Sequence, residues 1–110
     1  MPAVLIVDDN IPVLDLLEKV LALASYDVFK ACDGKQALDI LRGKAIDAVL
    51  TDIAMPGMDG AELLRAIREN NLSVPVIAMS GDYDAYAAVE AGFDAFICKP
   101  FKISSVLDIV

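Results

Sequence analysis

The sequence predicts an α/β fold in which a five-stranded parallel sheet has helices on both faces. Five short apolar runs alternate with five segments of helical spacing, and three of the runs are nearly continuous in Val, Ile and Leu, as in strands covered on both faces. This alternation implies right-handed crossovers, and five such units in 110 residues suit a flavodoxin-like doubly wound (βα)5 fold with strand order 2-1-3-4-5. The predicted strands are Val4–Val7, Asp27–Ala31, Ala48–Thr51, Val74–Met79 and Ala95–Cys98.

The first helical segment follows the first strand. Pro12 falls in its opening turn, where a missing N–H is tolerated. Apolar residues at helical spacing then predict a buried stripe. The predicted members of this stripe are Val13, Leu16, Leu17, Val20, Leu21 and Leu23.

Capping signals mark the second and third helices. Asp33 followed by Gln36 resembles a capping box, and Gly43 is a plausible stop for the helix that it opens. Asp59 followed by Glu62 repeats the cue, so Asp59 is interpreted as a helix cap. Six further aspartates are interpreted as solvated: Asp15, Asp39, Asp47, Asp84, Asp94 and Asp108.

Two short helices complete the prediction. The fourth follows Ser80 and ends near Gly92, and the fifth runs from Phe101 to Val110. Residues 1–110 are expected to form a single domain without an output domain. A fragment of a longer α/β chain is the alternative, because the last helix stops early.

Charge and composition narrow the partners. Nine Lys and Arg against 17 Asp and Glu leave a net charge of −8, with no basic run, so direct binding of nucleic acid or of an anionic membrane is not expected. The absence of histidine excludes a Ser-His-Asp triad and a His-ligated zinc site. Without a signal peptide or a long apolar segment, the chain is expected to be cytoplasmic, with Cys32 and Cys98 as buried free thiols.

Reactive residues recur at the carboxyl ends of the predicted strands. Asp8 and Asp9 follow the first strand, Asp52 the third, Ser80 the fourth and Lys99 the fifth. In open parallel sheets, ligands bind beyond these ends, at the point where the strand order reverses. The first and third strands flank that point, and they carry the three aspartates.

Electrostatics predicts what this edge of the sheet binds. Two carboxylates about 4 Å apart repel by roughly 4 kcal/mol at an effective dielectric constant near 20, so three need a cation or a proton. Oxygen ligands favour Mg²⁺, with Mn²⁺ as an alternative, and Mg²⁺ leaves coordination positions for phosphate oxygens. With the Lys99 ammonium and the Ser80 hydroxyl, the edge becomes a phosphoryl-binding site. Asp52 is the best candidate to attack phosphorus and form an acyl phosphate.

The residues at these strand ends resemble those of the response regulator receiver domain, the CheY-like superfamily of two-component phosphorelay signalling. The resemblance covers essentially the whole chain. Four ordered motifs carry it: Val4–Asn10, Thr51–Gly60, Ala78–Gly81 and Cys98–Phe101.

The resemblance implies roles for individual residues. Asp52 would accept a phosphoryl group from a phosphohistidine on a histidine kinase or a histidine phosphotransfer protein. Asp9, Asp52 and the backbone carbonyl of Ala54 would bind Mg²⁺ directly, and Asp8 would act mainly through metal-bound water. Lys99 would pair with the phosphoryl group.

The resemblance also implies a conformational switch. Ser80 would move toward the phosphoryl group, Phe96 matches the aromatic switch position, and the change would control a downstream protein partner. Such a domain catalyses only its own phosphorylation and dephosphorylation, so it is not an enzyme of free substrates. A monomer or a weak homodimer is expected. Because 19 positions separate Ser80 from Lys99, the fourth helix or its leading loop should be short, which puts the usual output face in doubt.

Two other function classes that use similar residues or the same fold each need a residue pattern that differs from this sequence. A Mg²⁺-dependent phosphatase with an aspartyl intermediate needs a second acid two residues after the nucleophile, where this chain has Ala54. A flavin-binding module needs a Ser-, Thr- or Gly-rich phosphate loop after the first strand, where this chain has Asp8, Asp9 and Asn10.

Overall fold

The computed structural model describes residues 2–53, 59–70, 73–80 and 92–98. A parallel sheet has the order β2-β1-β3-β4-β5, as predicted. The predicted fourth and fifth helices lie outside the described residues. In chain order the elements are β1 (Ala3–Val7), α1 (Ile11–Leu23), β2 (Asp27–Ala31), α2 (Gly34–Gly43), β3 (Ala48–Asp52), α3 (Gly60–Glu69), β4 (Val76–Ser80) and β5 (Ala95–Cys98).

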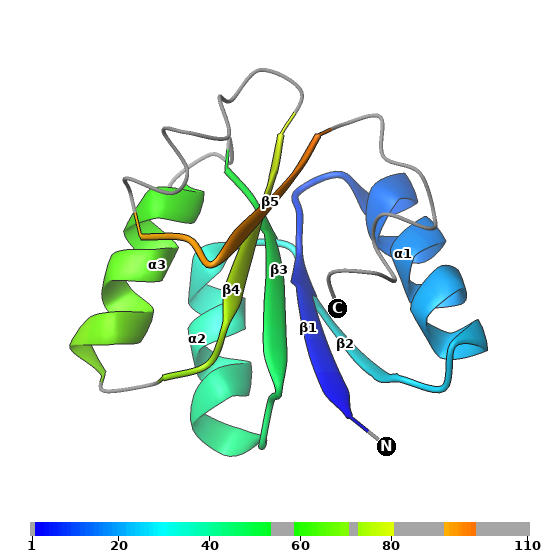
Figure 1. Ribbon diagram of the computed structural model, residues 1–110, viewed down its shortest axis with the longest axis horizontal. Helices are drawn as coiled ribbons and strands as arrows, with labels where there is room; N and C mark the ends of the chain where they lie inside the picture. Colours follow the sequence, from blue (N-terminus) through cyan, green and yellow to red (C-terminus); the bar gives the residue numbers. More distant parts are fainter. Residues whose placement is uncertain (1, 54–58, 71–72, 81–91, 99–110) are drawn as a thin grey trace.

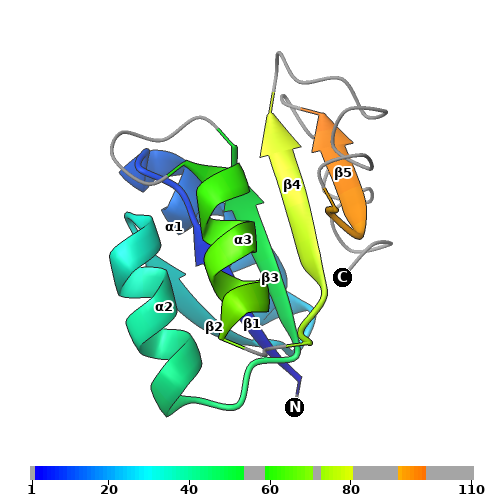
Figure 2. The ribbon, with the colours of Figure 1, turned by 90° about the vertical axis from the view of Figure 1, so that its left-hand side faces the viewer.

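Helices cover both faces of the sheet, as predicted. α2 and α3 lie on one face and α1 on the other (Figure 1), and Figure 2 shows α2 and α3 side by side in front of the strands. Successive residues of a strand point to opposite faces, so β1 contributes to two separate cores. Leu5 and Val7 pack with α2 and α3, whereas Val4 and Ile6 pack with α1. Burial on both faces explains why this strand is continuously apolar.

Three strands differ from the prediction in their bounds. β1 begins one residue earlier, at Ala3, and β3 continues one residue further, to Asp52. β4 runs from Val76 to Ser80 rather than from Val74 to Met79. Pro75 has no N–H to donate to the sheet, although its carbonyl accepts a hydrogen bond from the Val49 N–H at 2.9 Å. The proline therefore separates Val74 from the strand.

The buried face of α1 corrects the predicted stripe. Leu14 is buried beside Leu17 and Leu21, whereas Leu16 is 50% exposed and Leu23 is 88% exposed. The buried residues are spaced three and four apart and face the sheet, while Leu16 and Leu23 are seven apart and share a different side of the helix. The predicted stripe therefore wrongly included Leu16 and Leu23 and omitted Leu14, because the angle around the helix and not residue type decides which leucines are buried.

The predicted caps of α2 and α3 are confirmed. The Asp33 side chain accepts a hydrogen bond from the Gln36 N–H at 2.8 Å, and Asp59 accepts one from the Glu62 N–H at 2.9 Å. In a standard capping box, the Gln36 side chain would accept a hydrogen bond from the N–H of Asp33. Here it accepts one from the N–H of Cys32 instead, at 3.0 Å. Each cap satisfies a first-turn N–H that has no partner within its helix.

The prediction for the cysteines is confirmed in one respect and wrong in another. Cys32 is a free thiol, but it is half-buried rather than buried, because it lies just beyond the end of the edge strand β2. The side chain of Cys98 lies outside the described residues. None of the helices within the described ranges is both long enough and apolar enough to cross a membrane.

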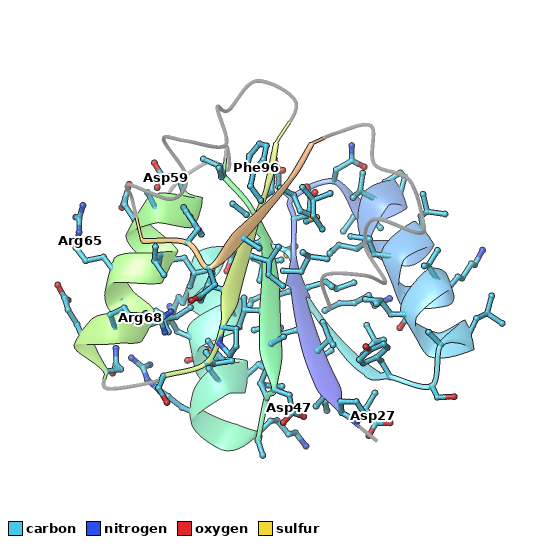
Figure 3. All side chains as sticks on the ribbon, viewed as in Figure 1. Asp27, Asp47, Asp59, Arg65, Arg68 and Phe96 are labelled. Atoms are coloured by element: carbon cyan, nitrogen blue, oxygen red, sulfur yellow. The ribbon has the colours of Figure 1, made fainter. Side chains whose placement is uncertain are left out.

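Two aspartates interpreted as merely solvated form specific contacts near the amino ends of the strands. The Asp94 carboxylate accepts a hydrogen bond from the Val76 N–H at 2.8 Å and pairs with Arg68 at 3.2 Å. Asp47 accepts one from the Ala3 N–H at 2.7 Å. Figure 3 shows Asp47 at the edge of the sheet opposite Asp59. Both aspartates are exposed, but each holds the start of a strand in place.

Replacing Asp94 with alanine is expected to lower the free energy of unfolding by about 1–3 kcal/mol, because the N–H of the buried Val76 loses a charged acceptor. Asp39→Ala is the matched control. Asp39 forms an exposed ion pair with Arg42 at 3.7 Å, and its replacement should cost less than about 0.5 kcal/mol. Urea unfolding measures the free energy of unfolding of both variants and of the wild type. Equal effects would contradict the role given to Asp94.

Candidate acidic site at the carboxyl edge of the sheet

Two predicted site residues continue the alternation of the central strands. Val4 and Ile6 face α1, and Asp8 is the next residue of that parity, directly beyond the end of β1. Leu50 faces α1 as well, and Asp52 follows it at the end of β3. Because β1 and β3 are adjacent and parallel, both carboxylates reach the same edge of the sheet on the same face.

Asp8, Asp9 and Asp52 form an acidic cluster. One carboxylate oxygen from each lies within 4.8 Å of the other two. Asp8 is 0% exposed and Asp52 is 7% exposed, whereas Asp9 is open to solvent. The convergence of these three carboxylates, predicted from strand order, is thus confirmed.

The loop between β1 and α1 holds the Asp8 side of the cluster. The Asp8 N–H donates to the carbonyl of Ala31 at 3.2 Å, and its carboxylate accepts from the N–H of Asn10 at 3.0 Å. The Asn10 side chain in turn caps α1 by accepting from the Val13 N–H at 3.3 Å. The backbone and the carboxylate of Asp8 are therefore held by contacts with β2 and with the start of α1.

The donor set of the acidic cluster suits a hard divalent cation. Three carboxylates at this spacing repel one another, and a cation of charge +2 offsets that repulsion. All of the candidate donors are oxygens, which favour Mg²⁺ or Mn²⁺ over softer metals. Exposed Asp9 leaves one side of the cluster open to solvent.

Lys30 on β2 forms ion pairs with α1. Its ammonium lies 3.1 Å from Glu18 and 3.4 Å from Asp15, both on α1. Hydrogen bonds with Glu18 and then Asp15 raise the pKa of Lys30 above its ordinary value. Among the described residues, the ion pairs of Lys30 are with α1 and not with the acidic cluster.

The register of β4 and β5 places the backbone of other predicted site residues. Asp52 lies opposite Met79, and the next residue, Ser80, lies opposite Cys98. The strand ends therefore meet at one edge. The side chain of Ser80 and all of Ala54 and Lys99 lie outside the described part of the chain.

Phe96, the predicted aromatic switch residue, lies in β5 opposite Ala78. It is half-buried and packs against the core on the α2 and α3 face (Figure 3). This is the face opposite the one that Leu50 and α1 share. The position of Phe96 is consistent with plain core packing as well as with a switch, so its role stays a prediction.

Thr51 and Gly60 are the two ends of the motif that contains Asp52. No role was predicted for either, and both lie against the backbone of Asp52. The Thr51 hydroxyl donates to the Asp52 carbonyl at 2.9 Å, and the Gly60 N–H donates to the Ile53 carbonyl at 2.8 Å. Threonine in a strand and glycine at a helix start are ordinary choices. Neither residue type carries a signal that would have revealed these contacts.

Comparison with known proteins identifies the family. The family model "Response regulator receiver domain" matches residues 4–110. The structure of the chemotaxis protein CheY4 from Vibrio cholerae superposes with a TM-score of 0.92 at 27% identity, covering 99% of this chain and 95% of that one.

Two further solved structures similar to this chain are also receiver domains. The receiver domain of the Francisella response regulator 1452 has a TM-score of 0.92 at 28% identity, covering 99% of this chain and 93% of that one. The receiver domain of NtrX from Brucella abortus has a TM-score of 0.89 at 31% identity, covering 96% of this chain and 92% of that one. The fold, the acidic cluster and the match over nearly the whole chain lead to one conclusion: this chain belongs to the response regulator receiver domain family of two-component signalling.

Proposed function

We propose that this receiver domain is a phosphoacceptor in which Asp52 takes a phosphoryl group from a phosphohistidine. The donor is a histidine kinase or a histidine phosphotransfer protein, and the phosphorylated domain controls a protein partner. The convergence of Asp8, Asp9 and Asp52 at the carboxyl edge of the sheet is the observation that carries the proposal. Family membership supports it.

Burial and position favour Asp52 as the acceptor among the three. Asp8 is fully buried and accepts a hydrogen bond from Asn10, and it lies beside β2 and the start of α1. Asp52 retains some exposure and ends β3, which lies between β1 and β4. An acceptor there has the acidic pair on one side and the ends of β4 and β5 on the other.

Transfer of the phosphoryl group requires no reactant other than Asp52 and the phosphohistidine. A carboxylate oxygen of Asp52 attacks phosphorus, the new O–P bond forms, and the N–P bond of the phosphohistidine breaks. The electron pair of that bond stays on the imidazole of the donor. The product is a mixed anhydride on Asp52, and hydrolysis of its O–P bond returns the carboxylate.

The acidic cluster would hold Mg²⁺, with Mn²⁺ as the alternative. Asp8, Asp9, Asp52 and the backbone carbonyl of Ala54 are the proposed ligands. The ion supplies positive charge that offsets the negative charge of the phosphoryl oxygens. The Lys99 ammonium and the Ser80 hydroxyl are proposed to bind the same phosphoryl oxygens.

Phosphorylation is proposed to shift an equilibrium between two conformations, with Ser80 and Phe96 repositioned. The output is then a change in protein contacts rather than turnover of a free metabolite.

Chemical trapping tests the site of phosphorylation. The protein is incubated with Mg²⁺ and a small phosphodonor and then reduced with borohydride, which converts an aspartyl phosphate to homoserine and leaves free carboxylates intact. Peptide mass spectrometry is expected to find homoserine at position 52, and only when Mg²⁺ is present. Homoserine at another position, or none anywhere, contradicts the proposal.

A further inference from the structure

The backbone of Asp52 touches the first residue of α3. The Gly60 N–H donates to the Ile53 carbonyl at 2.8 Å, so α3 begins directly against the end of β3 (Figure 2). A Cβ atom on residue 60 would lie 2.6 Å from the Asp52 carbonyl oxygen and 2.7 Å from the Ile53 Cα. Real Cβ atoms essentially never approach other atoms within 3.0 Å. Both of these neighbours are backbone atoms, so no side-chain rotation relieves the overlap.

α3 cannot easily move away from this contact. Three of its side chains are buried in the core on that face of the sheet, and Asp59 caps its first turn. Displacing the helix would disturb close-packed side chains, which tolerate small shifts poorly. The three buried side chains are Leu63, Leu64 and Ile67.

Two further hydrogen bonds hold the end of β3. The fully buried Thr51 donates its hydroxyl proton to the Asp52 carbonyl at 2.9 Å. The next residue, Ile53, donates its N–H to the carbonyl of Met79 at 3.1 Å. The Asp52 carbonyl oxygen is thus in contact with a hydroxyl group and with the Cα side of Gly60.

We propose that Gly60 and Thr51 are positioning residues that fix the backbone of Asp52 relative to Asp8 and Asp9. The inference rests on the proposed function of Asp52. Asp8 has its own contacts with Ala31 and Asn10, so a shift of the backbone at Asp52 would change the spacing within the acidic cluster. A misplacement of about 1 Å at a reacting group can cost about 100-fold in rate.

Gly60→Ala tests the close approach, and Gly43→Ala is the matched control. Gly43 also lies in a helix, but a Cβ there would meet nothing within 4 Å. In Gly60→Ala, Mn²⁺ affinity is expected to fall about tenfold and the initial rate of phosphorylation about 10- to 100-fold. Gly43→Ala should match the wild type in both. Circular dichroism at a temperature well below the unfolding midpoint confirms that each variant is folded.

The pair Thr51→Val and Thr51→Ser tests the hydroxyl without a backbone overlap. Valine keeps the shape and loses the donor, whereas serine keeps the donor and loses a methyl group. Mn²⁺ affinity is expected to fall several-fold in Thr51→Val and to remain near the wild-type value in Thr51→Ser. If Gly60→Ala does not fold, this pair decides the question.

Wild-type Mn²⁺ affinity in folded Gly60→Ala, or equal affinities in the two Thr51 variants, would overturn the inference. The outcomes also separate it from the proposed function. A wild-type protein that takes no phosphoryl group refutes the proposed function, while the Mn²⁺ affinities still decide whether these residues position Asp52.

Discussion

Asp52→Asn is expected to reduce incorporation of a phosphoryl group to background. An amide has nearly the shape of the carboxylate, so the buried end of β3 is preserved, but it lacks the anionic oxygen that attacks phosphorus. Intact-protein mass spectrometry after incubation with Mg²⁺ and a small phosphodonor measures the effect. This is the largest change expected of any single substitution, because it removes the bond-forming atom itself.

Asp59→Asn is the matched control for this experiment. Asp59 lies at the same edge of the sheet (Figure 3), and it also places a carboxylate near the loop that follows β3. It caps α3 through the Glu62 N–H, and asparagine caps helices about as well as aspartate. Phosphorylation of this variant should equal that of the wild type. Unchanged labelling of Asp52→Asn would defeat the assignment of the acceptor.

Asp9→Asn is expected to have opposite effects on stability in the absence and presence of Mg²⁺. Without the ion, removing one of three converging charges should raise the free energy of unfolding by about 1 kcal/mol, since the repulsion is weakened by the exposure of Asp9. With Mg²⁺ at 100 times its dissociation constant, the wild type gains about 2.7 kcal/mol. The variant should gain little, because it lacks a ligand.

Urea unfolding in chelator and in Mg²⁺ measures both effects. Asp39→Asn serves as the control, since Asp39 is exposed on α2 and lies outside the acidic cluster. It should leave the gain from Mg²⁺ at the wild-type value. An equal gain from Mg²⁺ in Asp9→Asn and the wild type would show that Asp9 does not bind the ion.

Local signals in the sequence predicted much of the fold. The caps at Asp33 and Asp59 were predictable because each bond joins residues three positions apart. The alternation of apolar runs and helical segments predicted a parallel sheet with right-handed crossovers. Five such units in 110 residues suited the flavodoxin-like strand order that the structure has. The meeting of Asp8, Asp9 and Asp52 followed from that order, since parallel strands end at the same edge.

Other features depended on contacts between distant parts of the chain. Leu14 rather than Leu16 faces the sheet, which depends on how α1 is rotated against its neighbours. Asp94 binds the start of β4, 18 residues away, and Asp47 binds the start of β1, 44 residues away. No pattern in a single segment distinguishes these aspartates from solvated ones.

The sequence by itself determined which strands form, their order and which carboxylates gather beyond their ends, because helical and strand periodicity and the handedness of crossovers are local properties of the chain. Only the tertiary structure decided how closely α3 approaches the end of β3. That contact leaves no space for a Cβ at Gly60. The physical reason is that such spacing results from the packing of whole elements against one another, which no residue specifies alone.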